Sequence, residues 1–274
     1  MRLDTESVVD LFIKTWSGDA KWLPYCLAGH SRYARDFRQL VLITDKGFDF
    51  EISEISATNI PIKIIEADPT EAGYIENPPF WSVTRQGKIT EKSPRGPGYY
   101  WQQAVKMSWP EYSDADAVVI LDTDVIAWDK FCAMDFTMNG QPYWRTKPYK
   151  TNDNDLIWKN CVESFLGESV CKNYMLKYPD NPYLFTREAT IGFAAQIRER
   201  YDLSIIDFFR PTSDGLRLSE FSLFGAYLDR VNRHGYIIVD FDTFIGVPDI
   251  PLKQYWSWGG LDPLFEDIDQ IIQS

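Results

Sequence analysis

Two aspartates, Asp122 and Asp124, follow a short apolar run in the middle of the chain. The run, Ala117–Leu121, is too short to span a membrane, and its lack of polar side chains is typical of a strand buried on both faces. Side chains alternate along a strand, so we expect both carboxylates on one side and Thr123 on the other. Such a pair favours a divalent cation with hard oxygen ligands, Mg²⁺ or Mn²⁺. The alternative is a strand that ends in solvated aspartates.

A further candidate acid is Glu220, in the stretch SEFSLFGAYL. Ser219 is a typical helix cap, which would place Glu220 in the first turn of a helix. An acid at this position ordinarily stabilises the helix dipole, and the helix N-terminus then lowers its pKa. The alternative is a carboxylate that faces a cleft as a base, with burial raising its pKa instead. The expected buried stripe of this helix consists of Phe221, Phe224, Leu228 and Val231, and its expected end is Gly235.

The elements that position these residues begin with an α/β pattern. Residues 7–16, 39–45 and 60–68 are apolar runs with polar ends, and they predict three further strands. A helix capped by Asp19 and extending to about residue 33 separates the first two. This order predicts the opening of a doubly wound sheet.

Ligands of such sheets bind beyond the carboxyl ends of the strands. Lys14, Thr15 and Asp45 stand at the ends of the first two predicted strands. We therefore expect them at the same edge as Asp122 and Asp124.

Residues 98–109 predict a helix directly before the Asp-x-Asp strand. Gln102, Gln103 and Lys106 lie three and four residues apart, on the side opposite its apolar positions. They either reach a bound nucleotide or form an exposed polar face. The long loop before this helix carries four cations that either meet phosphates or stay solvated: Arg85, Lys88, Lys92 and Arg95.

The second half of the chain predicts a mixture of helices and short strands. Asn139-Gly140 indicates a hairpin. The other expected elements are helices over 153–166 and 186–200, a last strand over 236–244, a loop over 248–260 and an acidic helix over 262–273. The loop contains Lys253 and the aromatic stretch YWSW, which either covers a ligand as a lid or packs against the sheet.

The composition of the chain argues against some kinds of function. The chain has 274 residues and a net charge of −12, which argues against broad binding to nucleic acid or to anionic membranes. Its four cysteines form no Cys-x-x-Cys pair, which favours a reducing, cytoplasmic location. We see no signal-peptide pattern and no apolar stretch near the roughly 20 residues of a spanning helix.

Three stretches in this order, GYYWQQAVKM, VVILDTDV and SEFSLFGAYL, resemble the GT-A-fold glycosyltransferases. More closely, they resemble a poorly characterised bacterial and phage family of GT-A-like proteins. The likeness runs from about Val8 to the final strand. It implies a single α/β domain over residues 1–274 with a Rossmann-like, doubly wound mixed sheet. Residues 1–128 would form the nucleotide-sugar-binding half, and residues 129–274 the acceptor half with a C-terminal lid.

The resemblance implies transfer of a hexose or pentose from a nucleoside-diphosphate sugar to a hydroxyl acceptor. The acceptor would be a glycan, a lipid-linked sugar or a modified nucleic-acid base. Mn²⁺ or Mg²⁺, held by Asp122 and Asp124, would bind the diphosphate. Asp124 and Glu220 would be the catalytic residues, with Glu220 either deprotonating or orienting the acceptor. The residues implied in donor binding are Lys14, Thr15, Asp45, Gln103, Lys106, Asp122 and Thr123.

One departure from the family concerns the third metal ligand, which is often a histidine from the C-terminal part. His234 precedes the last predicted strand rather than following it, so we do not expect it to bind metal. Asp242 or water would serve instead, or the two aspartates alone.

Three other functions remain open. A nucleotidyltransferase would use the same metal on a similar fold, although no glycine-rich nucleotide loop lies near Lys14. A haloacid-dehalogenase-type phosphatase also carries Asp-x-Asp after an apolar strand, but usually near the start of the chain. A non-enzymatic glycan-binding module would rely on aromatic residues without metal.

Overall fold

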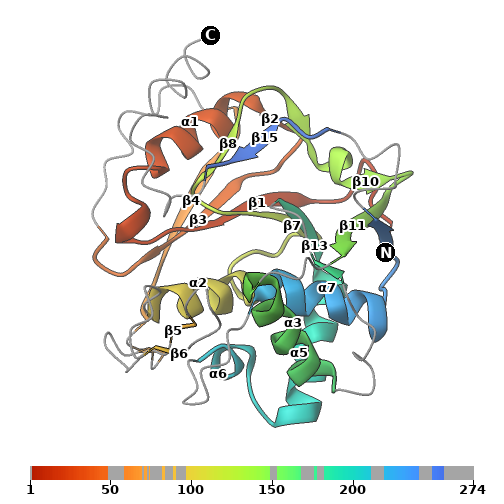
Figure 1. The fold of residues 1–274 in the computed structure, drawn as a ribbon. Coiled ribbons are helices and arrows are strands. Elements are labelled where there is room, and N and C mark those ends of the chain that lie inside the picture. The colour runs from red at the N-terminus through yellow and green to blue at the C-terminus, as the bar shows by residue number, and fades with distance from the viewer. Residues whose placement is uncertain are drawn as a thin grey trace.

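A five-stranded sheet forms the centre of the computed structural model (Figure 1). The structure describes residues 2–48, 59–69, 71–72, 74, 82–83, 89–90, 97–148, 153–167, 176–177, 182–210, 219–240 and 249–255. The strand order is β13-β7-β1-β3-β4. Four strands of this sheet run parallel: β1 (Val9–Lys14), β3 (Leu40–Asp45), β4 (Ile62–Ala67) and β7 (Ala117–Leu121). The edge strand β13 (Tyr183–Thr186) pairs antiparallel with β7.

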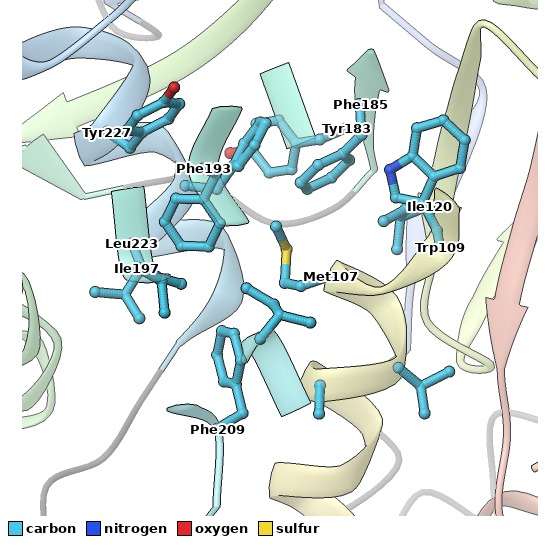
Figure 2. Packing of buried hydrophobic residues seen from close by; sticks show 14 of the residues in the cluster. Met107, Trp109, Ile120, Tyr183, Phe185, Phe193, Ile197, Phe209, Leu223 and Tyr227 are labelled. Atoms are coloured by element: carbon cyan, nitrogen blue, oxygen red, sulfur yellow. The ribbon is translucent and has the colours of Figure 1, made fainter. Parts of the chain in front are cut away.

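Helices cover both faces of this sheet (Figure 1). Alternation along β1 sends Leu11 and Ile13 into the core on the side of α1 (Leu23–Tyr33), and Phe12 into the core on the other side. That second core is rich in aromatic rings contributed by several helices and β13, as Figure 2 shows. Its helices are α2 (Pro97–Met107), α3 (Asp153–Leu166), α5 (Arg187–Tyr201), α6 (Ile205–Phe208) and α7 (Glu220–Arg230).

Shorter strands form several smaller sheets outside the central one. β10 (Thr137–Met138), β11 (Gln141–Pro148), β12 (Leu176–Lys177) and β14 (Ile237–Asp240) form a second sheet. Two-stranded sheets pair β8 (Val125–Ala127) with β15 (Leu252–Gln254), β2 (Ala34–Arg35) with β9 (Phe131–Cys132), and β5 (Ser82–Val83) with β6 (Ile89–Thr90). The 3-10 helices are η1 (Ser17–Asp19), η2 (Trp109–Glu111) and η3 (Ala133–Phe136).

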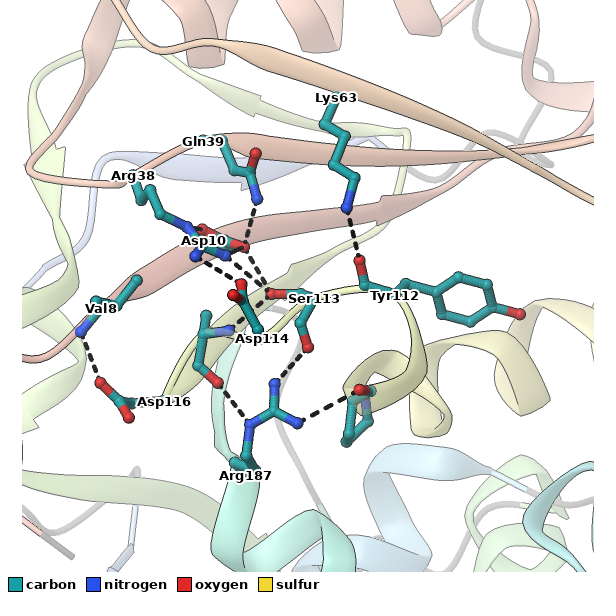
Figure 3. A network of polar contacts seen from close by, with 12 residues as sticks. Val8, Asp10, Arg38, Gln39, Lys63, Tyr112, Ser113, Asp114, Asp116 and Arg187 are labelled. Carbon is teal, nitrogen blue, oxygen red and sulfur yellow. Dashed lines mark hydrogen bonds and ion pairs between the residues drawn. The ribbon is translucent and has the colours of Figure 1, made fainter.

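A polar network anchors the amino end of the sheet (Figure 3). The Asp10 carboxylate is fully buried, and it accepts hydrogen bonds from Arg38 Nη2 at 2.7 Å, Ser113 Oγ at 2.7 Å and Gln39 Nε2 at 3.0 Å. Arg187 donates to the carbonyl of Ala115 at 2.8 Å. These bonds satisfy a buried charge at the end of β1 that lies opposite the aspartate pair. We therefore assign the network a role in stabilising the fold.

Most predicted elements are confirmed. The Asn139-Gly140 hairpin connects β10 and β11, with φ values of 52° and 76° that fit a type I′ turn. The predicted helix start at Asp19 is wrong, because Asp19 ends η1 and Pro24 lies in the first turn of α1.

Two predictions near the C-terminus are also wrong. The helix α7 ends at Arg230, so Val231 is 46% exposed rather than part of the buried stripe. The predicted last strand is followed by β15, which lies inside the predicted loop 248–260. The final acidic helix, Asp242, Trp256, Trp258 and the four loop cations fall outside the described residues. Among the residues that the structure describes, no helix is both long and apolar enough for a membrane crossing.

Candidate active site

Asp122 and Asp124 come directly after β7, at the carboxyl edge of the parallel strands. Asp124 is buried, whereas the Asp122 side chain is 21% exposed. One amide group contacts both carboxylates: Gln254 Nε2 donates to Asp122 Oδ2 at 3.2 Å and to Asp124 Oδ1 at 3.2 Å. The two carboxylates therefore face a common point. Residues 122–124 lie in a turn between β7 and β8 rather than on a strand, so this arrangement does not come from the predicted alternation.

The neighbouring strand β15 brings Gln254 to this point. Gln254 lies opposite Val125 in the β8–β15 pair, one residue beyond Asp124. Tyr255 extends the pairing, because its amide donates to the carbonyl of Asp124 at 2.7 Å. Its ring stacks on Trp22 with a centroid separation of 6.1 Å. The sequence analysis missed Gln254, since a three-residue strand is too short to give a clear alternation.

Lys106 joins the Asp-x-Asp strand to the C-terminal half. Its Nζ atom forms an ion pair with Asp122 Oδ1 and a second, at 2.9 Å, with Glu220 Oε1. The ammonium also lies 5.1 Å from the ring centroid of Phe221. Burial alone would lower the pKa of Lys106, but the two carboxylates outweigh this effect and raise it, so the side chain is a cation. The alternative of an exposed polar face on α2 is wrong here, because Lys106 is 2% exposed.

Glu220 lies in the first turn of α7, as predicted, and it is buried. Burial raises the pKa of Glu220 above its usual value, although Lys106 opposes the rise. The pKa lowering expected from the helix N-terminus is therefore outweighed, which makes Glu220 a stronger base. Gln103 fixes this turn, because its Oε1 atom accepts a hydrogen bond from Glu220 N at 3.1 Å. Within the described residues, the buried Nε2 of Gln103 has no hydrogen-bond partner.

Lys14, Thr15 and Asp45 gather at the same edge of the sheet. Lys14 Nζ lies 2.6 Å from Asp45 Oδ1 and also donates to the carbonyl of Thr15. Burial lowers the pKa of Lys14, and Asp45 opposes this effect. Asp45 Oδ1 accepts a further hydrogen bond from Trp101 Nε1 at 2.9 Å.

The side chain of Gln102 links this group to the aspartate pair. Its Nε2 atom donates to the carbonyl of Lys14 and to Asp122 Oδ1, both at 3.4 Å. The hydroxyls of Thr15 and Thr123 are buried and have no hydrogen-bond partner among the described residues.

Trp16 is an exposed aromatic residue that the sequence analysis did not single out. Its side chain is 41% exposed, and it lies beside the start of α2, where a Cβ atom at Gly98 would be 3.5 Å from its ring.

The acidic side chains that the structure describes do not by themselves make a complete metal cage. Among the described residues, no group of three or more His, Cys, Asp or Glu side chains is placed to hold a metal ion. The ring of His234 forms hydrogen bonds with Tyr227 Oη at 2.6 Å and Glu188 Oε1 at 3.3 Å, between α5 and α7. The donor set at the aspartate pair is two carboxylates and one amide, all of which offer the hard oxygens that Mg²⁺ and Mn²⁺ prefer.

Comparison with known proteins supports the fold. No protein-family model and no curated protein sequence matches the chain, so the resemblance to a bacterial and phage family stays a prediction. The chain is similar to the galactosyltransferase LgtC, solved in a crystal structure with donor and acceptor sugar analogues. The likeness has a TM-score of 0.50 at 12% sequence identity and covers 96% of this chain and 95% of LgtC. The mixed sheet with its parallel core therefore has the GT-A-like glycosyltransferase fold.

Proposed function

We propose that this protein is a metal-dependent glycosyltransferase. It moves a hexosyl or pentosyl group from a nucleoside-diphosphate sugar to a hydroxyl of a glycan, a lipid-linked sugar or a modified base. The observation that carries the proposal is the pair of contacts made by Lys106. They bring Asp122, at the end of β7, and Glu220, at the start of α7, to one buried ammonium group in a GT-A-like fold.

Donor binding is assigned to the carboxyl edge of the sheet. Asp122 and Asp124 would hold Mn²⁺ or Mg²⁺, which when bound supplies a Lewis acid for the departing diphosphate. Lys14, Thr15 and Asp45 would hold the base and ribose. The hydroxyls of Thr15 and Thr123, which have no partner within the described ranges, support this assignment, because buried polar groups normally find a partner.

The acceptor chemistry is assigned to Glu220. In an inverting reaction its carboxylate takes the proton of the acceptor hydroxyl as that oxygen attacks the sugar, and its raised pKa suits this role. In a retaining reaction it orients the hydroxyl instead. Lys106 and Gln103 hold the carboxylate and the helix turn that carries it. A cytoplasmic location is part of the proposal, supported by the free thiols of Cys26, Cys132 and Cys161.

A thermal-shift screen of nucleoside diphosphates and nucleotide sugars tests the proposal. A ligand that binds only the native state raises the melting temperature. We expect a rise that requires both Mn²⁺ and an intact Asp124, and that Asp124→Ala abolishes. Mass spectrometry of the product then distinguishes transfer of a sugar from transfer of a nucleotide.

Two outcomes would replace this function with another. Turnover of a simple phosphate ester without any response to nucleotides would support the phosphatase. Sugar binding that survives Asp124→Ala and needs no metal would support a glycan-binding module.

A further inference from the structure

We infer that Gln254 supplies the third protein ligand of the divalent cation by turning its side-chain amide over. This inference rests on the proposed function, because it concerns the metal assigned there to Asp122 and Asp124. It gives β15, a strand of the C-terminal part, a direct role in binding the metal.

The position of the amide is the first argument. A single atom, Gln254 Nε2, lies 3.2 Å from one carboxylate oxygen of each aspartate. In an octahedral Mg²⁺ site with bonds of about 2.05 Å, neighbouring ligand atoms lie about 2.9 Å apart. The amide nitrogen therefore already occupies a position close to that of a ligand adjacent to both carboxylate oxygens.

The chemistry of the amide is the second argument. Its NH₂ group is a donor and suits the oxygens of carboxylates, whereas its carbonyl oxygen is a hard metal ligand. A half-turn about the last torsion of the side chain exchanges these two atoms with little change in shape. The same residue can thus stabilise the aspartates without metal and bind the cation when it arrives.

The surroundings keep the amide in place during this exchange. The backbone of β15 is fixed by the pairing of Gln254 with Val125 and by the hydrogen bond from Tyr255 N to the carbonyl of Asp124. Lys106 and Gln102 contact Asp122 through Oδ1, and Gln254 contacts it through Oδ2. The oxygen that faces Gln254 is therefore different from the one paired with Lys106.

Mn²⁺ binding to the whole chain, followed by the electron paramagnetic resonance signal of the free ion, tests the inference without any measurement of activity. We expect Gln254→Leu to weaken Mn²⁺ binding by about tenfold or more, the scale of losing a supporting residue at a metal site. Gln254→Glu keeps an oxygen at this position and should bind Mn²⁺ at least as tightly as wild type. Gln141→Leu makes the same change on β11, where the amide donates to the carbonyl of Gly235, and should have no effect.

The outcomes separate this inference from the proposed function. Wild-type affinity in Gln254→Leu, together with loss of binding in Asp124→Asn, would overturn the role of Gln254 and leave the metal site standing. Equal losses in Gln254→Leu and Gln254→Glu would also overturn it, because the oxygen would then not matter. Absence of Mn²⁺ binding in the wild type would overturn both proposals.

Discussion

Lys106 is the residue on which the charges of the candidate site depend. Its ammonium faces Asp122 and Glu220 from a buried position, so Lys106→Met leaves two carboxylates without their cation. Breaking a buried ion pair in this way costs about 3 kcal/mol or more. We expect urea denaturation at pH 7 to show a loss of that size.

The pH dependence of Lys106→Met follows from Glu220. Without Lys106, the pKa of Glu220 in the folded state rises further above its unfolded value. A carboxyl group whose pKa is higher in the folded state than in the unfolded state destabilises the fold as the pH rises and the group loses its proton. The loss of unfolding free energy in Lys106→Met should therefore become smaller toward pH 4. The matched control is Lys46→Met, which removes an exposed ammonium that also faces two carboxylates, Asp68 and Glu71. We expect Lys46→Met to leave the midpoint of urea denaturation unchanged. An unchanged midpoint in Lys106→Met would contradict our account.

His30 should make the protein sensitive to mild acid. Its ring is fully buried, Nε2 donates to the carbonyl of Val125 at 3.0 Å, and burial lowers its pKa to about 4. At pH values between the unfolded pKa near 6.5 and the folded pKa of about 4, the unfolded chain binds more protons than the folded protein does. The stability of the fold therefore falls as the pH falls. We expect a contribution of about 2 kcal/mol to be lost between pH 7 and pH 5.

The variant His30→Gln keeps a donor for Val125 but does not titrate in this range. Urea denaturation at both pH values should therefore show a smaller acid loss than in the wild type. An identical loss in the two proteins would assign the acid sensitivity to other groups.

At the scale of elements, α1 must lie very close to β8, the strand that follows the aspartate pair. A Cβ atom at Gly29 would lie 2.8 Å from the carbonyl oxygen of Ala127, which is backbone and cannot easily move. Gly29→Ala should destabilise the protein by about 1–3 kcal/mol through overpacking, despite the better helix propensity of alanine. Gly98→Ala in α2 is the control, because the nearest atom would be 3.5 Å away. Thermal melting of both variants checks this, and equal melting temperatures would refute the close contact.

Elements with a strong local signal could be predicted from the sequence. The buried strand β7, the hairpin at Asn139 and the capped helix at Ser219 each carry residues that favour one structure locally. The start of α1 also has a local signal, Pro24 in its first turn, and the prediction of a cap at Asp19 overlooked it. The strand β15 could not be predicted, because it depends on pairing with a strand far away in the sequence.

At the scale of the whole molecule, the two halves of the chain complete one another. The edge strand β13 comes from residues 129–274 and covers β7, whose five residues are all buried. A fragment of residues 1–128 would expose this strand, so we expect no cooperative urea transition in its circular dichroism. The full chain should unfold in one transition. A sharp transition in the fragment would show instead that the first half is an independent domain.

The candidate site could be predicted in part at this scale. Asp45 and Asp122 stand at strand ends, where general rules of α/β folds place functional residues, and Glu220 stands at a helix start. Lys106 lies in the last turn of α2, where only the spacing of its polar neighbours singled it out. The joining of Lys106 to Glu220 and of Gln254 to the aspartates could not be predicted, because these contacts cross more than 100 residues of sequence. They are set by packing of the whole chain.

The separation between Asp124 and Gln254 also has a consequence for biosynthesis. The two residues are 130 positions apart, yet their side chains meet. At a synthesis rate of roughly 5–20 residues per second, Gln254 is made about 7–26 s after Asp124. During that interval the aspartates lack the amide that satisfies them, and β7 first lacks β13. A nascent chain is therefore exposed to misfolding, and to capture by chaperones, until the segment that carries Gln254 has been made.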